Sequence, residues 1–216
     1  MKMIRIPRIA IIILLSLVLA GCARLPVREE VKLDNSVPVG KIEGNQFTGI
    51  RYPFNVAAPA NWQVTMKFPE FMLELGFDKE GLEESQVFIF NPATQSNVQI
   101  DFSPVSRYAK YSQKSIEWLT NAAGGSFRSE FEQDYGKDVS FEISRTEPYS
   151  LKGVPYAAKR YTTYTIKDVK REHGWVYAFA EPFQIFIIYM VLEKEGADDH
   201  PAIKEILNSF EVVEKK

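Results

Sequence analysis

Residues 184–192 constrain the fold more than any other part of the chain, because they are apolar on both faces of a strand. Side chains alternate between the two sides of a sheet along a strand. One side would carry Phe186, Ile188, Met190 and Leu192, and the other Ile185, Ile187, Tyr189 and Val191. A strand that is apolar on both sides is buried on both sides. The chain is therefore expected to build a sheet that is covered on each face.

Further strands are predicted where β-branched and aromatic residues cluster between turn residues. The ranges are 47–56, 62–66, 87–90, 98–102, 139–145, 156–166 and 175–180. Pro53 interrupts the first of them and places it at the start or border of the sheet. Short turns, such as 58–61, 151–155 and Glu181-Pro182, join neighbouring strands. The sheet should therefore be mostly antiparallel.

Two helices are predicted in the middle of the chain. Ser112 or Ser115 can cap the first, which presents Ile116, Leu119 and Ala123 on one side, and Gly124-Gly125 stops it. A second short helix ends at Gly136 and carries aromatic residues spaced by four, namely Phe127, Phe131 and Tyr135.

A third helix is predicted near the C-terminus, where Pro201 suits the first turn. Its apolar stripe consists of Ile203, Ile206, Leu207 and Phe210. Residues 47–213 then form a single α+β domain. We expect an α/β/α sandwich, in which a central, mostly antiparallel β-sheet is covered by helices on both faces.

Three short motifs of this domain resemble the PsbP-like group. They are Tyr52-Pro53 with Pro59-Ala60-Asn61-Trp62, Leu151-Lys152-Gly153-Val154-Pro155-Tyr156, and Ile206-Leu207-Asn208-Ser209-Phe210. The group includes an extrinsic subunit of photosystem II, relatives that act in assembly, and bacterial lipoproteins of unassigned role. The resemblance implies an α/β/α sandwich used for binding and assembly rather than catalysis. The motifs are structural, so they carry over no functional residue.

The N-terminus has the pattern of a bacterial lipoprotein signal peptide. Lys2, Arg5 and Arg8 precede an apolar run at 9–20, which is shorter than the roughly 20 residues that span a bilayer. The run closes on Leu19-Ala20-Gly21-Cys22, which is similar to a lipobox. In lipoproteins with this motif the thiol receives diacylglycerol and the preceding bond is then cut. Residues 1–21 would be the signal peptide, Leu19, Ala20 and Gly21 the peptidase recognition residues, and Cys22 the lipid attachment site.

Cys22 is the only cysteine, so no intramolecular disulfide can form and the thiol is best explained as an acylation site. Acyl chains such as palmitate would hold the protein on a membrane. Ala23 indicates the outer membrane, facing the periplasm, if the host has two membranes. The alternatives are an ordinary secretory signal that ends near a cysteine, and an uncleaved anchor.

Residues 22–46 are expected to be a lipidated, flexible tether, because the segment mixes charge, proline and glycine without a sustained period. A docked strand around 27–33 is the alternative.

Cleavage of the signal peptide would remove three of the 26 basic residues and none of the 28 acidic ones, leaving a net charge of about −5. This balance argues against nucleic acid as a partner.

No catalytic motif is present, and neither a metal nor a cofactor is expected. His200 follows Asp198-Asp199, which could be drawn as a metal site, but acids at the start of a helix favour its dipole and explain the cluster more simply. His173-Gly174 indicates a hairpin turn. An acidic patch in a polar loop is best explained as solvated surface, and it consists of Asp78, Glu80, Glu83 and Glu84.

Aromatic residues are the best binding candidates. Two strands that should be adjacent carry Tyr156, Tyr161, Tyr164, Trp175 and Tyr177. Most of these rings are expected in the core, and several exposed together would form a ligand or partner surface. Residues 68–73 form a second apolar candidate, either a short packed helix or a lid.

Three functions are consistent with these features. The preferred hypothesis is a membrane-anchored, non-catalytic binding or assembly module of the cell envelope, with the membrane and an envelope protein as partners. The second is a carrier or sensor of a small hydrophobic ligand, which a deep apolar pocket would support. The third is a hydrolase, which would require His173 or His200 to converge with a serine and a carboxylate.

Overall fold

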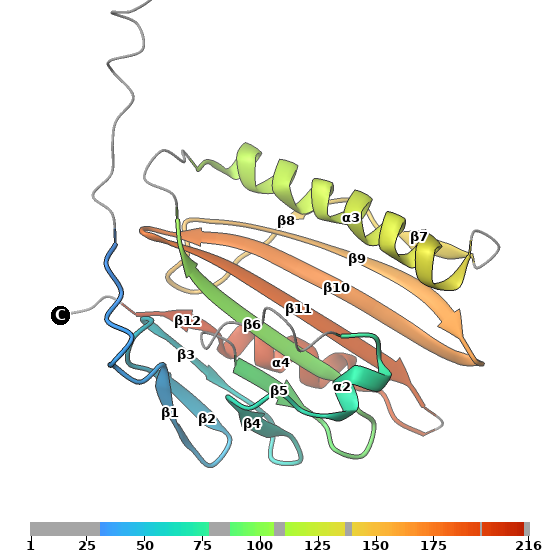
Figure 1. Cartoon of the computed structure of the whole chain (residues 1–216), viewed down its shortest axis with the longest axis horizontal. Coiled ribbons are helices and arrows are strands. Elements are labelled where there is room, and N and C mark those ends of the chain that lie inside the picture. Colours follow the sequence, from blue (N-terminus) through green and yellow to red (C-terminus); the bar gives the residue numbers. More distant parts are fainter. Residues whose placement is uncertain (1–30, 78–86, 106–110, 137–139, 195, 214–216) are drawn as a thin grey trace, which may run out of the picture. The chain divides into compact units, whose positions relative to one another are not determined.

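An eight-stranded antiparallel sheet dominates the structure, a computed structural model that describes residues 31–77, 87–105, 111–136, 140–194 and 196–213 (Figure 1). One short strand, β8 (Glu147–Pro148), pairs with β9 (Tyr156–Ile166) and is not part of the strand order given next. The strand order is β4 (Gln63–Thr65), β5 (Val87–Phe90), β6 (Asn97–Pro104), β11 (Phe183–Glu193), β10 (Val169–Ala180), β9 (Tyr156–Ile166) and β7 (Phe141–Ile143). The antiparallel sheet predicted from short turns is thereby confirmed.

Tight turns fix the register of the three longest strands. Ile166 pairs with Val169 across Lys167 and Asp168, whose positive φ angles of 50° and 63° match the twist of a two-residue hairpin. β10 continues without interruption from this hairpin to Ala180, so the hairpin turn predicted at His173-Gly174 is wrong. These two residues instead lie within β10 and pair with β11.

Gly174 is needed inside this strand because Tyr189 of β11 lies directly over it. A Cβ atom at Gly174 would lie 2.0 Å from Cζ of Tyr189, which is far inside contact distance. The sequence pattern treats the glycine as a turn residue, whereas here it makes room for a ring.

A second, four-stranded sheet was not anticipated. Its order is β1 (Gly40–Glu43), β2 (Gln46–Gly49), β3 (Phe54–Ala57) and β12 (Glu211–Val212). The range 47–56, which we expected to border the main sheet, supplies β2 and β3 of this sheet instead. Pro53 has no N–H to donate to a ladder and lies in the connection between them.

Part of the expected tether is also structured. β1 lies within residues 22–46, and the side chains of Val31 and Leu33 pack against the core. The segment 31–33 is docked without forming a strand. The signal peptide and residues 22–30 lie outside the described residues.

The main core lies between one face of the large sheet, the second sheet and α4 (His200–Ser209). Ile185, Ile187 and Tyr189 of β11 belong to this core with Phe54 of β3. The predicted stripe of the C-terminal helix is confirmed, and Pro201 occupies its first turn. The buried residues of that stripe are Ile203, Ile206, Leu207 and Phe210.

One helix, α3 (Gln113–Tyr135), packs on β9 and β10 from the opposite side (Figure 1). Ser112 caps it and forms a reciprocal pair with Ser115, so both predicted capping residues are used. The predicted stop at Gly124-Gly125 is wrong, because the helix continues to Gly136. Gly124 instead allows close approach, since a Cβ atom there would lie 2.9 Å from Nη1 of Arg160 and 3.0 Å from Cδ1 of Ile143.

Helices that cover both faces are not confirmed in the expected form. α4 shares its face of the sheet with β-strands, and α3 packs mainly on β9 and β10. A helix is about 10 Å wide, whereas strands are about 4.8 Å apart, so one helix covers about two strands.

Within the described ranges, no helix combines the length and apolar character needed to cross a membrane.

Candidate functional site

A pocket of about 400 Å³, lined by side chains of the sheet and of α3, lies beside α3. Its floor is formed by β10 and β11, and one wall is the C-terminal half of α3. The opposite wall is the segment Leu75 to Phe77, which follows α2 (Phe71–Glu74). The pocket lies where α3 no longer covers the sheet.

The floor follows from the alternation of side chains along paired strands. His173, Trp175 and Tyr177 point from β10 to the pocket side. They pair in register with Met190, Ile188 and Phe186 of β11, respectively. Because cross-strand partners are direct neighbours on one face, six side chains form a continuous surface. The rings of Tyr177 and Phe186 are stacked with centroids 4.3 Å apart.

The wall on α3 uses the aromatic spacing of four that the sequence analysis noted. Phe127, Phe131 and Tyr135 lie on one helical face and line the pocket. The ring of Phe127 stacks on Trp175 at 6.0 Å and meets His173 edge-on at 4.9 Å. These contacts fix the height of the helix above the floor.

Trp175 is further held by a hydrogen bond, in which its indole Nε1 donates to the carbonyl oxygen of Thr120 at 2.9 Å. Phe186 and Ile188 are only half-buried. The second apolar face of β11, which we expected to be covered, is therefore partly open. This opening is the pocket.

The titratable groups of the pocket floor are uncharged at neutral pH. Burial, together with the positive charge of Arg171, lowers the pKa of His173 to about 4. Burial raises the pKa of the Tyr164 phenol to about 12 and also raises that of Tyr177. The floor therefore presents aromatic and apolar surface, while the carboxylates of Glu130 and Asp134 lie exposed on the helix edge of the pocket.

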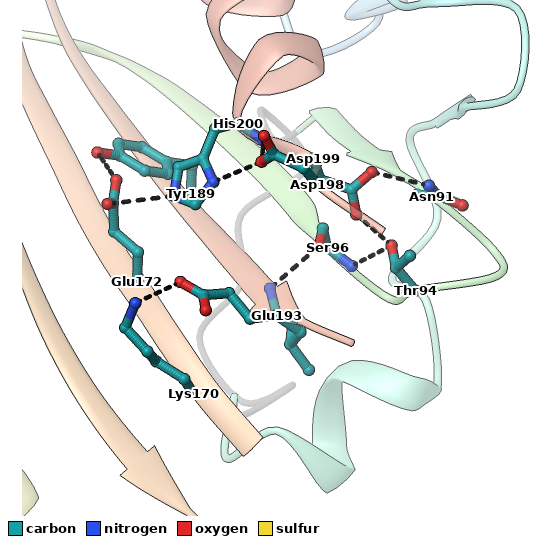
Figure 2. A network of polar contacts seen from close by, with 11 residues as sticks. Asn91, Thr94, Ser96, Lys170, Glu172, Tyr189, Glu193, Asp198, Asp199 and His200 are labelled. Carbon is teal, nitrogen blue, oxygen red and sulfur yellow. Dashed lines mark hydrogen bonds and ion pairs between the residues drawn. The ribbon is translucent and has the colours of Figure 1, made fainter. Parts of the chain in front are cut away.

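A second cluster of polar side chains lies at the start of α4, on the other face of the sheet (Figure 2). The hydroxyl of Tyr189 donates to Oε1 of Glu172 at 2.9 Å. Nε2 of His200 lies 3.4 Å from Oε2 of the same carboxylate, and Nδ1 lies 2.8 Å from Oδ1 of Asp198. Burial alone would lower the pKa of His200, but Asp198 and Glu172 outweigh it and raise the pKa.

Asp199 connects the same end of α4 to the loop between β5 and β6 (Figure 2). Its carboxylate accepts hydrogen bonds from Nδ2 of Asn91 at 3.1 Å and from Oγ1 of Thr94 at 2.5 Å. Asp199 is the N-cap residue of α4, although its side chain forms no capping bond with the helix. The described residues contain no group of three or more His, Cys, Asp or Glu side chains arranged to hold a metal. We interpret this cluster as the device that docks α4 on the sheet.

The structure separates the aromatic residues that the sequence analysis grouped together. Tyr164, Trp175 and Tyr177 line the pocket. Tyr156 instead packs near Phe179, and Tyr161 is 40% exposed. The prediction that most rings are core therefore holds for part of the group, and three rings contribute to a ligand-sized surface.

The second apolar candidate lies next to the pocket, whereas the predicted lipid attachment site is not described by the structure. Residues 68–73 include the start of the short helix α2, which buries Met72, and the pocket wall begins just after this helix. Cys22, its recognition residues Leu19, Ala20 and Gly21, and the acidic patch at 78–84 lie outside the described residues. The contributions of Phe186, Ile188 and Met190 were missed because an open strand face has the same sequence pattern as a buried one.

Comparisons with known proteins identify the fold. The chain matches no protein-family model and no curated protein. Cyanobacterial PsbP from Synechocystis sp. PCC 6803 is 12% identical, over 82% of this chain and 99% of that chain, with a TM-score of 0.53. LpqN, involved in cell envelope biogenesis of Mycobacterium tuberculosis, is 11% identical over 73% of this chain and 82% of that chain, with a TM-score of 0.47. The similarity to PsbP shows that the domain has a PsbP-like fold.

Proposed function

We propose that this protein is a membrane-anchored, non-catalytic binding module of the cell envelope, and that the aromatic pocket binds a small, largely apolar ligand. The observation that carries the proposal is the open, uncharged floor of β10 and β11 beside α3. A pocket of about 400 Å³ is within the range of small-molecule sites. A ligand bound there would cover the exposed parts of Phe186 and Ile188, which α3 does not cover.

The anchor in this proposal is lipid on Cys22, placed after the recognition residues Leu19, Ala20 and Gly21. Ala23 favours the outer membrane of a two-membraned host, facing the periplasm. Replacing Cys22 with serine should release the protein from the membrane fraction, and the intact mass of the wild-type N-terminal peptide should include the acyl chains. A bare thiol in the mature wild-type protein would contradict the anchor without affecting the pocket.

The pocket offers weak support for a hydrolase. His173 lines it together with Ser126, Glu130 and Asp134, which are residue types that hydrolases use. A histidine with a pKa of about 4 is, however, a poor general base at neutral pH. Its neighbours are the rings of Phe77 and Phe127, at 5.9 Å and 4.9 Å. These features favour binding over catalysis.

Two adjacent alanines on α3 provide a matched test. Ala123 lines the pocket, whereas Ala122 is exposed outside it. Ala123→Phe should fill part of the cavity, while Ala122→Phe adds the same side chain to the outer surface. Excluding about 60 Å² of apolar ligand surface costs about 1.5 kcal/mol, or about tenfold in affinity.

The measurement is a fluorescence titration with N-phenyl-1-naphthylamine, a neutral apolar probe. The wild type and Ala122→Phe should bind it with similar affinity, and Ala123→Phe should bind it at least about tenfold more weakly. Circular dichroism and thermal melting verify that each variant is folded. Saturable binding that is equal in all three proteins would place the probe elsewhere and contradict the proposal, as would no binding by the wild type.

A protein partner in the envelope is the second candidate, and Trp118 is the observation that favours it. Its side chain is 68% exposed on α3, and tryptophan is enriched at protein interfaces. Crosslinking in native membranes should capture a partner through the wild type and lose it in Trp118→Ala. Equal capture by both proteins would contradict a role for this surface.

A further inference from the structure

We propose that the pocket selects an organic cation, meaning a ligand that carries an ammonium group on an apolar or aromatic body. The inference rests on the proposed function and specifies the ligand class for the same site. It combines two features of the pocket, which are the aromatic rings of its floor and two carboxylates at its edge.

The carboxylates are Glu130 and Asp134, four residues apart on α3. Side chains at this spacing lie on the same face of a helix, and both line the pocket. Both side chains are exposed, and within the described part of the chain neither forms an ion pair. Two like charges side by side are unfavourable for the helix, and a cation placed between them would relieve that repulsion.

The floor supplies the second feature. Tyr177 and Phe186 are half-buried, and Trp175 lines the same surface. The negative faces of aromatic rings attract an ammonium group within about 6 Å. Nothing on the floor opposes a cation, because His173 is neutral and the Tyr164 phenol keeps its proton.

Among the described residues, Arg171 is a positive group near the pocket and must be considered. Arg171 is two residues before His173 in β10, and its charge contributes to lowering the pKa of His173. Arg171 does not line the pocket, and it interacts with the Tyr164 phenol. Arg171 therefore acts on Tyr164 and His173 from the sheet, whereas the ammonium group of the ligand is placed at the two carboxylates of α3.

Three naphthalene probes that share one apolar body can test this ligand class by isothermal titration calorimetry. They are (naphthalen-2-ylmethyl)trimethylammonium, 2-naphthylmethanol and 2-naphthaleneacetate, which are cationic, neutral and anionic. Two carboxylates at 5–6 Å should each contribute about threefold, so the cation should bind about tenfold more tightly than the alcohol at low salt. The preference should shrink as the salt concentration rises.

The double variant Glu130→Gln/Asp134→Asn should bind the cation about tenfold more weakly and leave the alcohol within about twofold. The matched control is Glu117→Gln/Glu132→Gln, which removes the same charge from α3 at two positions that do not line the pocket. This control should retain the cation preference.

Equal binding of the cation and the alcohol by the wild type, or tightest binding of the anion, would overturn the ligand class while leaving a pocket that binds apolar bodies. An equal loss in the control variant would also overturn it, because the effect would then follow net charge. Failure of all three probes to bind would instead contradict the proposed function itself.

Discussion

His173 provides a sharp test of the pocket, because its pKa is tied to the apolar surroundings. In the folded protein this pKa is lowered to about 4, mainly by burial and in part by Arg171. A histidine in an unfolded chain has a pKa near 6.5. As the pH falls below about 6.5, the unfolded state therefore takes up a proton while folded His173 stays neutral. Stability that is present at neutral pH is lost as the pH falls toward 4.

The size of this loss follows from the two pKa values. Between pH 7 and pH 5, proton uptake by the unfolded state should lower the free energy of unfolding by about 2 kcal/mol. His173→Phe keeps a ring between Phe77 and Phe127 but cannot titrate. The wild type should therefore lose about 2 kcal/mol more than this variant over that interval.

Urea unfolding at pH 7 and pH 5, followed by circular dichroism, measures the difference. Proton NMR of the imidazole measures the folded pKa directly and should give a midpoint near 4. His200→Gln is a control of opposite sign, since the pKa of His200 is raised and its contribution is lost as the pH rises through that value. Identical pH dependence in the wild type and His173→Phe, or a midpoint near 6.5, would refute a neutral His173 in apolar surroundings.

Four further substitutions test the packing of the fold, each by urea unfolding. Gly125→Ala, with nothing within 4 Å of its Cβ, should raise the free energy of unfolding by up to about 1 kcal/mol, and Gly124→Ala should gain less or lose stability. Equal gains would contradict close packing at Gly124. Gly174→Ala should cost about 3 kcal/mol, because its Cβ meets the ring of buried Tyr189, and a cost below 1 kcal/mol would contradict that contact. Asp199→Ala should cost about 3 kcal/mol, since it leaves two buried donors unpaired, and a neutral effect would show that α4 is docked by other contacts.

Several strands of the large sheet were predictable from the sequence to within a few residues, because a half-buried strand repeats every two residues. The predicted ranges 87–90 and 156–166 match β5 and β9. The C-terminal helix was equally clear, since its apolar stripe has a helical period. Both signals are local, so they survive without knowledge of the tertiary fold.

Two of the errors share a physical cause, which is that a glycine indicates either a backbone conformation or a lack of space. Gly124 and Gly174 were interpreted as a helix stop and a turn. Both lie within regular elements, where the contact of a distant side chain requires the absence of Cβ. No local pattern contains that contact, so tertiary packing overrode the turn propensity.

The pocket could be predicted only in part for a related reason. The aromatic spacing on α3 and the apolar alternation of β11 were both visible in the sequence. Whether α3 would reach far enough to cover Phe186 and Ile188 depends on the width of the sheet relative to one helix. That ratio is a property of the assembled fold.

In the proposed function, the pocket beside α3 holds a small ligand in the envelope-anchored protein. Native mass spectrometry of the mature protein, purified gently from its own membranes, tests it most directly. We expect a mass excess from one small molecule in the wild type and in Ala122→Phe, and a reduced excess or none in Ala123→Phe. A wild-type mass that contains only the polypeptide and its lipid, or an adduct that Ala123→Phe retains in full, would contradict the claim.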